Sequence, residues 1–212
     1  MTHAELDSPE PTPGSDSPAA VRKRPKPGER RVQILQALAT MLEQPGAERI
    51  TTAALAARLD VSEAALYRHF ASKAQMFEGL IEFIEQSVFT LINQIAEREP
   101  AGQAQAGRIV AMLIQFAEKN PGMTRVMVGD ALVFENDRLQ QRMNQFFDKI
   151  EASLKQCLRG AAEAESAAPT VEAQVRASML TAFVVGRLQR FARSGFKRLP
   201  SEHLEASLSR ML

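Results

Sequence analysis

Tyr67, Arg68 and His69 stand side by side and carry the polar and aromatic groups of the chain that are best suited to chemistry. A phenol, a guanidinium and an imidazole all donate hydrogen bonds, and phosphate oxygens and base edges accept them. His69 is a poor metal ligand, because the other two histidines, His3 and His203, lie near the chain ends. The trio therefore favours contact with a nucleic acid.

Two short helices are predicted to position this trio. Thr51 or Thr52 can cap the first helix, and Ser62 can cap the second after a turn at positions 60–62. Two short helices joined by such a turn, with longer helices on either side, are typical of a helix-turn-helix. The second helix of that motif enters the major groove of DNA. An ordinary helical hairpin with an alanine-rich face is the alternative.

The second short helix has an apolar face and an open face. Leu66 and Phe70 lie four residues apart and are expected to face the core. Small residues on the opposite side let the backbone approach the bases, and an alanine methyl can contact thymine. The residues assigned to DNA recognition, phosphate contact or capping are Thr51, Thr52, Ser62, Glu63, Ala64, Ala65, Tyr67, Arg68, His69 and Lys73.

A long helix is predicted to begin directly after this motif. Ser72 and Gln75 have the S-x-x-Q spacing of a capping box, in which both side chains satisfy backbone N–H groups at the helix start. The positive end of this helix, together with Lys73, is where a DNA phosphate would dock.

Helical periodicity continues through most of the remaining chain, and no alternating strand pattern of useful length appears. Helices are expected at about 29–44, 72–99, 103–119, 121–129, 137–159, 171–193 and 202–212. The sequence therefore predicts an all-α fold. It would comprise a three-helix helix-turn-helix DNA-binding domain at 29–75 and a helical dimerisation and partner-binding domain at 76–212.

Residues 1–28 are predicted to be a disordered arm. They hold six of the eleven prolines and show no helical periodicity. Acidic residues come first, and the basic run RKRPK at 22–26 follows, next to the predicted DNA-binding domain. The arm is either a solvated tail or a basic segment that meets DNA phosphates.

Several features argue against roles in catalysis or at a membrane. GQAQAGRI at 102–109 has the glycine spacing of a phosphate loop but lacks its Lys and Ser/Thr, and no strand precedes it. Cys157, the sole cysteine, lies on an apolar helix face and suits a reducing, intracellular setting. Apolar runs are far shorter than the ~18 residues of a membrane span. We therefore predict a cytoplasmic protein without enzymatic activity, cofactor or metal.

The segment TTAALAARLDVSEAALYRHFASKAQMF at 51–77 resembles the DNA-binding domain of the TetR family of bacterial regulators. RITTA at 49–53, LIEFIE at 80–85, NPG at 120–122 and FENDRLQ at 134–140 resemble the nucleoid occlusion factors of that family. The resemblance covers about residues 29–200 and implies an all-helical homodimer on palindromic double-stranded DNA. Asp60 departs from the pattern, which usually has glycine in the turn, but Asp tolerates a left-handed backbone.

The resemblance also implies a function. Nucleoid occlusion factors of this kind bind palindromic sites dispersed over the chromosome and engage the tubulin-like division protein FtsZ. They keep a septum from closing over the nucleoid, with which they are associated. Their homodimers would act singly or paired on DNA. The alternatives are a ligand-responsive TetR-type repressor with a small-molecule pocket and a helical adaptor that does not bind DNA.

Two long helices are expected to form the dimer interface. An apolar stripe at 139–158 includes Phe146 and Ile150, which are assigned chiefly to the core of the monomer. The next helix has a second stripe, in which two small residues four positions apart allow close helix approach. The residues assigned to the dimer interface are Val175, Met179, Ala182 and Gly186.

The partner surface is placed on the long helix that begins after Ser72. Phe83 falls ~120° from the apolar stripe of that helix at ~100° per residue, among polar side chains. It is either covered by a neighbouring helix or exposed for a partner. Guided by the resemblance, we assign Phe83, Met112, Lys119 and Asn120 to a groove that receives a short FtsZ segment.

Overall fold

The computed structural model describes residues 28–44, 50–165 and 168–212, which form helices and no strand. The helices are α1 (Glu29–Leu42), α2 (Thr52–Arg58), α3 (Glu63–Tyr67), α4 (Lys73–Arg98), α5 (Gln103–Lys119), α6 (Pro121–Met127), the 3-10 helix η1 (Asp130–Leu132), α7 (Asp137–Glu165), α8 (Pro169–Arg193) and α9 (Leu204–Met211). The predicted all-α fold is confirmed. The predicted arm, apart from Gly28, lies outside the described residues.

The short helices begin at the hydroxyl caps that the sequence predicts. Thr51 accepts a hydrogen bond from the Ala54 N–H at 3.1 Å, so Thr51 rather than Thr52 caps α2. Ser62 caps α3 in the same way. In the intervening turn Asp60 has φ 54°, the left-handed conformation expected where glycine is usual.

The cap of α4 is reciprocal. Ser72 accepts a hydrogen bond from the Gln75 N–H at 3.2 Å, and the Gln75 side chain accepts one from the Ala71 N–H at 2.9 Å. Two backbone donors that the helix cannot satisfy internally are thereby satisfied. The direction of α4 is fixed immediately after the helix-turn-helix.

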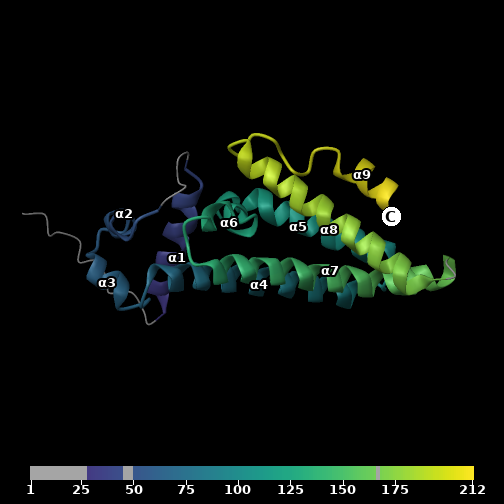
Figure 1. The fold of residues 1–212 in the computed structure, drawn as a ribbon, viewed down its shortest axis with the longest axis horizontal. Coiled ribbons are helices and arrows are strands. Elements are labelled where there is room, and N and C mark those ends of the chain that lie inside the picture. Colours follow the sequence, from purple (N-terminus) through teal and green to yellow (C-terminus); the bar gives the residue numbers. More distant parts are fainter. Residues whose placement is uncertain (1–27, 45–49, 166–167) are drawn as a thin grey trace, which may run out of the picture.

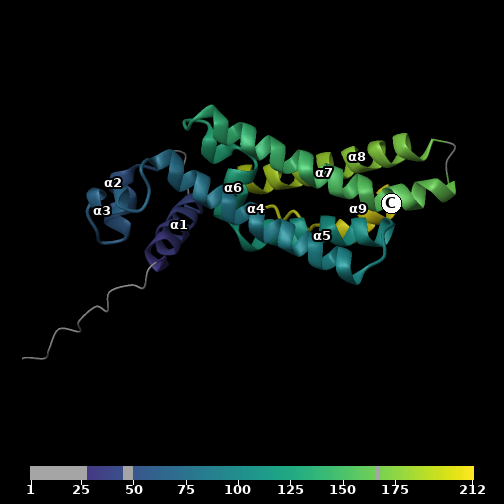
Figure 2. The same ribbon diagram turned by 90° about the horizontal axis from the view of Figure 1, so that it is seen from below.

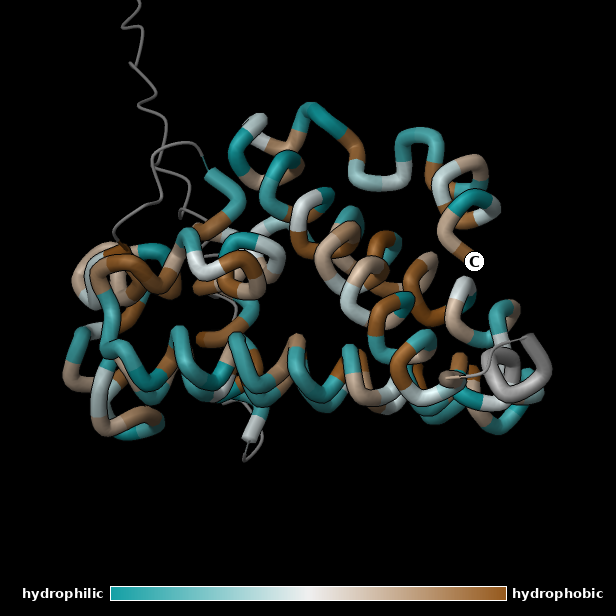
Figure 3. The backbone as a smooth tube through the Cα atoms, turned by 45° about the vertical axis from the view of Figure 1, so that its right-hand side comes forward, coloured by the Kyte–Doolittle hydropathy of each residue, from teal (hydrophilic) through white to brown (hydrophobic). Residues whose placement is uncertain are grey.

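Helices α1, α2 and α3 lie together at one end of the molecule, and the longer helices lie beside one another in the rest of it (Figure 1). Figure 2 shows α4 extending from the α1–α3 end into the long helices. Hydrophobic and hydrophilic residues recur along each long helix, as expected of helices that bury one face (Figure 3). The predicted division at 75/76 falls in the first turn of α4, which runs unbroken across it.

The apolar stripe of α7 lies in the core. Its members Leu139, Met143, Phe146, Ile150, Leu154 and Leu158 are buried, and Phe147, which was predicted in the same stripe, is half-buried. The Phe146 ring meets the Phe89 ring of α4 edge-to-face, with centroids 5.7 Å apart. Each fully buried side chain of this size stabilises the fold by about 1.5–3 kcal/mol. This confirms the core assignment of Phe146 and Ile150.

Ion pairs connect α4 to the start of α7. Arg138 pairs with Glu78 at 2.7 Å, and Arg142 pairs with Glu85 at 2.6 Å through two guanidinium nitrogens. The hydrogen bond from Glu85 raises the pKa of the Arg142 guanidinium, while partial burial acts in the opposite direction. The forked geometry holds α7 at a fixed register along α4.

Helix α6 rests directly on the backbone of α1. A Cβ atom placed on Gly122 would lie 1.9 Å from the Ala39 carbonyl oxygen, so glycine is required for this approach. Arg125 is 8% exposed; it pairs with Asp130 at 2.8 Å and donates a hydrogen bond to the Leu42 carbonyl near the end of α1. The carboxyl end of α1 is therefore fastened to α6.

Some predicted helix ends need correction. Helix α7 continues to Glu165, beyond the predicted end near 159. Helix α6 ends at Met127 rather than near 129, because Gly129 takes φ 80°, and the short helix η1 follows. A left-handed glycine is a common way to end a helix.

Candidate DNA-binding, partner and dimer surfaces

The two faces of α3 are as the sequence predicts. Leu66 of α3 is 1% exposed and forms its inner side. Phe70, predicted on the same helix, is also 1% exposed but lies three residues after the end of α3 at Tyr67. Tyr67 is 46% exposed, and Arg68 and His69 are exposed beside it. The open side of α3 also includes Ser62, Glu63 and Ala64, while Ala65 is half-buried. A short helix with small residues and exposed donors can enter a DNA groove.

Thr52 and Glu63 bind each other rather than standing free. The Thr52 hydroxyl donates a hydrogen bond to the Glu63 carboxylate at 2.5 Å, which joins the start of α2 to the start of α3. The carboxylate of Glu63 keeps its negative charge, because the hydroxyl is a neutral donor. In this arrangement it orients Thr52, whose hydroxyl can still accept a hydrogen bond.

Arg31 of α1 braces the end of α3. Its guanidinium donates a hydrogen bond to the His69 carbonyl and lies 4.1 Å from the centre of the Phe70 ring. The sequence did not predict a role for Arg31. No local pattern reveals its role, because Arg31 and His69 are 38 positions apart.

Lys73 has a carboxylate partner in this structure. Its ammonium pairs with Glu135, and the side chains of the two residues are 27% and 11% exposed. Lys73 therefore lies at the amino end of α4, as predicted for a phosphate contact, but a phosphate there would compete with Glu135. The contribution of Glu135, which lies between η1 and α7, was not predicted.

The four residues assigned to the partner surface come from α4, α5 and the α5–α6 bend. Phe83 is 48% exposed, and Lys119 is exposed. Met112 and Asn120 are half-buried, and the Asn120 amide donates to the Phe116 carbonyl at 2.8 Å. Phe83 lies ~200° around α4 from Glu85, whose partner is on α7, so Phe83 is on the side away from α7. An exposed phenylalanine on this side of α4 is available to a partner.

The predicted dimer face of α8 is open in the single chain. Val175 and Met179 are 49% and 52% exposed, and Val171 on the same side is 64% exposed. Ala182 is also exposed, and a Cβ atom on Gly186 would meet nothing within 4 Å. An exposed apolar stripe of this length, with small residues at its carboxyl-terminal end, can pack against a helix of a second copy.

Other chemistry finds little support in the described part of the chain. Cys157 is 6% exposed, and burial raises the pKa of its thiol, which makes the thiol less reactive. Within the described ranges, no three His, Cys, Asp or Glu side chains gather into a possible metal site. None of the described helices is long and apolar enough to cross a membrane.

Two family profiles match the chain. Residues 34–80 match the bacterial regulatory proteins of the TetR family, and residues 103–211 match a tetracyclin repressor-like C-terminal domain of the SlmA-like type. The first match includes the helix-turn-helix and the start of α4. The second includes α5 to α9.

Relatives of similar sequence match over most of their length. The nucleoid occlusion factor SlmA of Idiomarina loihiensis is 54% identical over 177 residues, which is 84% of this chain and 90% of that protein. SlmA of Escherichia fergusonii is 52% identical over 84% of this chain and 90% of that protein. SlmA of Vibrio vulnificus is 51% identical over 85% of this chain and 92% of that protein. These relatives are named as nucleoid occlusion factors and not as enzymes.

Solved structures share the fold at low sequence identity. The fatty acid degradation regulator FadR from Bacillus halodurans superposes with a TM-score of 0.72 at 12% identity, over 87% of this chain and 95% of that one. The TetR family regulator PfmR from Thermus thermophilus gives a TM-score of 0.67 at 18% identity, over 86% and 95%. The chain therefore belongs to the SlmA family of nucleoid occlusion factors, with the helix-turn-helix and fold of the TetR regulators.

Proposed function

We propose that this protein is a nucleoid occlusion factor that binds dispersed palindromic chromosomal sites as a homodimer. When bound there, it antagonises assembly of the FtsZ ring over the nucleoid. The identity of 51–54% to SlmA proteins over 83–85% of the chain carries this proposal. The exposed polar side of α3 supports the DNA-binding part, and a cytoplasmic, nucleoid-associated location follows from it.

The proposed DNA contacts follow from the geometry of the helix-turn-helix. Tyr67, Arg68 and His69 are available to base edges and phosphates, and Lys73 contacts a phosphate in exchange with Glu135. Two-fold symmetry would place two α3 helices about 34–36 Å apart, so the site should be a palindrome with half-sites about one turn apart.

Genome-wide mapping of bound DNA tests the function directly. We expect many dispersed sites that share one palindrome. A single site beside the protein's own gene would instead support the alternative, a ligand-responsive repressor. Deletion of the gene should also allow FtsZ rings to form over unsegregated nucleoids when division timing is disturbed, and normal ring placement in that background would contradict the proposal.

The partner surface is proposed on α4, α5 and the α5–α6 bend. An exposed aromatic ring at Phe83, a flexible half-buried Met112 and the polar pair Lys119 and Asn120 suit a short peptide with an apolar anchor and acidic or amide groups. Because Phe83 is half-exposed, truncating it leaves the described core intact.

Peptide binding separates this surface from the DNA surface. An FtsZ tail peptide should bind Phe83→Ala at least about tenfold more weakly than the parent, a typical loss for an exposed aromatic anchor. Phe89→Leu is the matched control, because Phe89 is on the same helix but packs against Phe146 on the α7 side. Full peptide affinity in both Phe83→Ala and Asn120→Ala would show that the groove lies elsewhere.

A further inference from the structure

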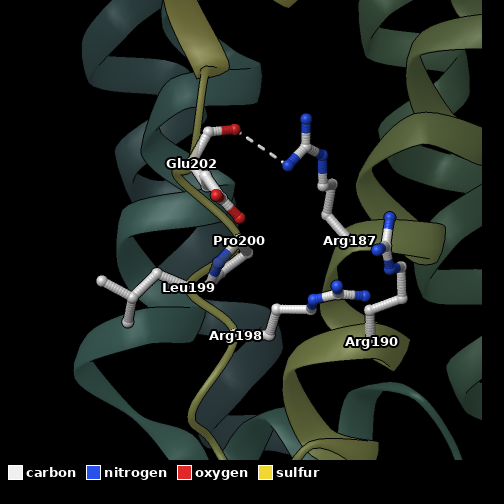
Figure 4. A pocket seen from close by; sticks show the side chains of 6 residues that line it. All are labelled: Arg187, Arg190, Arg198, Leu199, Pro200 and Glu202. Carbon is white, nitrogen blue, oxygen red and sulfur yellow. Dashed lines mark hydrogen bonds between the residues drawn. The ribbon is translucent and has the colours of Figure 1, made fainter.

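Three arginine side chains gather around one surface pocket between the end of α8 and the segment that leads to α9. Arg187 and Arg190 come from α8, and Arg198 comes from the segment after it (Figure 4). Leu199, Pro200 and Glu202 form the opposite wall. Arg187, Arg198 and the opposite wall lie outside the DNA, partner and dimer surfaces described above. Arg190 is four residues after Gly186 and lies on the side of α8 that is predicted to face the second copy.

The backbone after α8 is shaped to bring Arg198 back toward the helix. Gly195 and Phe196 both take left-handed conformations, with φ 61° and 64°. The left-handed backbone of Phe196 is strained. It is held in place because the Phe196 N–H donates a hydrogen bond to the Phe191 carbonyl and the two phenylalanine rings pack with their centroids 5.2 Å apart. The backbone N–H of Arg198 then donates a hydrogen bond to the Ser194 hydroxyl at 2.9 Å.

Arg187 fixes the far wall of the pocket. Its guanidinium donates to the Glu202 carbonyl at 2.8 Å and to the Ser207 hydroxyl at 3.3 Å, and it lies 4.9 Å from the centre of the Phe183 ring. These three contacts hold the guanidinium in place and tie the segment before α9 to α8. Arg187 is therefore preorganised rather than a free surface side chain.

The positive charge around the pocket is not balanced by the protein. Residues 187–202 contain five cations (Arg187, Arg190, Arg193, Lys197 and Arg198) and one carboxylate (Glu202), although the whole chain carries a net charge of only +1. Among the residues that the structure describes, no carboxylate forms an ion pair with Arg190 or Arg198. The negative end of α8 accounts for cations in its last turn, but not for Arg198 beyond it.

We propose that this pocket binds the phosphate group of a small soluble phosphate ester. Guanidinium groups present paired donors that match phosphate oxygens, and Arg190 and Arg198 would supply them. The guanidinium of Arg187 is already bound to Glu202 and Ser207, and its charge adds to the preference for a dianionic phosphate over a singly charged carboxylate. Six residues surround this small pocket, a lining that suits one phosphate group rather than a strand of DNA. Its lining residues come from α8 and the segment after it, and none comes from α2 or α3.

Calorimetric titration of the full chain with inorganic phosphate tests the site. At constant ionic strength in chloride buffer, the parent should bind phosphate saturably with a Kd in roughly the millimolar range or below, and more tightly than acetate. Arg198→Gln and Arg190→Gln should each weaken binding about ten- to a hundredfold, the range for a charge-assisted hydrogen bond. Lys197→Gln is the matched control, an exposed cation of the same segment that does not line the pocket, and should bind like the parent.

Two further arms distinguish the source of the phosphate. The same variants are titrated with a DNA duplex that lacks the palindrome and with vesicles that contain phosphatidate. The proposal is overturned if the parent does not bind free phosphate saturably. This holds even if the duplex or the vesicles bind in a way that depends on Arg198. Equal loss of phosphate binding in Lys197→Gln and Arg198→Gln also overturns it, since it would show a diffuse effect of charge.

Discussion

At the scale of single residues, Gly122 sets how closely α6 approaches α1. The space for a side chain at this position is taken by the Ala39 carbonyl oxygen, 1.9 Å from where a Cβ atom would be. The obstacle is backbone rather than the flexible end of a side chain, so neither helix can yield without moving as a whole. Close packing makes such an overlap costly.

Gly122→Ala should therefore lower the free energy of unfolding by about 1–3 kcal/mol or more, the range for overpacking a filled site. Gly160→Ala in α7 is the matched control, because a Cβ atom there meets nothing within 4 Å. That control should be stabilised by about 0.5–1 kcal/mol, since alanine favours the helix. Urea unfolding at one fixed protein concentration measures both, and equal effects of the two variants would contradict the account of the α1–α6 contact.

At the scale of elements, α8 has a buried side within the chain and an open apolar side. Gly186 lies at the carboxyl-terminal end of the open apolar side, with no other group near the position of a Cβ atom in the single chain. A larger residue there leaves the monomer unstrained but would hold apart two helices that meet at this point. The proposed dimer can thus be tested without damage to the fold.

Gly186→Leu should shift the protein from dimer to monomer at micromolar concentration while its helix content stays that of the parent. Light scattering and circular dichroism measure the two properties. Ala206→Leu on α9 enlarges another exposed small residue outside the proposed interface and should remain dimeric. A parent that is already monomeric would rule out the interface, as would a Gly186→Leu protein that remains dimeric.

The junction between α3 and α4 makes a second prediction at this scale. Lys73→Ala should weaken binding to all DNA sequences similarly and flatten the dependence of log affinity on log salt by roughly one unit, because one phosphate contact is lost. Glu135→Gln should do the reverse, strengthening binding and steepening the salt dependence, because Lys73 no longer shares its charge with a carboxylate. Unchanged salt slopes in both variants would exclude a phosphate contact at Lys73.

Capping residues and helical periodicity predicted the short helices and the start of α4 from the sequence. Contacts between residues far apart in the sequence could not be predicted in this way. Ser62 and Ser72 each lie three residues before the backbone N–H group that their hydroxyl accepts from, so both helix starts could be predicted from the sequence. The exposed side of α3 followed from the helical period. Arg31 and Arg125, in contrast, act through carbonyl groups 38 and 83 positions away, and no periodicity encodes such pairs. The length of α7 was underestimated because its small-residue end resembles a linker.

At the scale of the whole molecule, the proposed partner surface and the DNA-binding end meet at the α5–α6 bend. Asn120 belongs to the partner surface and is the residue directly before α6. Two positions later Gly122 touches α1, and Arg125 donates to the Leu42 carbonyl at 3.4 Å. Helix α1 in turn braces α3 through Arg31. A rigid chain of contacts thus joins the two surfaces within one protomer.

This arrangement predicts that DNA and the FtsZ peptide affect each other's affinity. Because Gly122 of α6 packs directly against the Ala39 carbonyl of α1, we expect a shift of α1 on DNA to move α6 and the α5–α6 bend with it. We expect a palindromic duplex to change peptide affinity at least about fivefold, and the peptide to change DNA affinity by the same factor, as linkage requires. Fluorescence anisotropy with a labelled peptide, with and without duplex, measures the first, and the converse titration measures the second.

Arg125→Met separates this coupling from binding itself. Methionine fills much of the same buried space but cannot donate to the Leu42 carbonyl or to Asp130. Each ligand alone should bind the variant nearly as it binds the parent, because Arg125 belongs to neither surface. The factor by which one ligand changes the affinity of the other should fall toward one. Arg138→Met is the matched control, since its ion pair with Glu78 joins α7 to α4 and not α6 to α1. Peptide affinity that is identical with and without duplex in the parent would show that the two surfaces act independently, and loss of coupling in Arg138→Met alone would place the connection on the α4–α7 side instead.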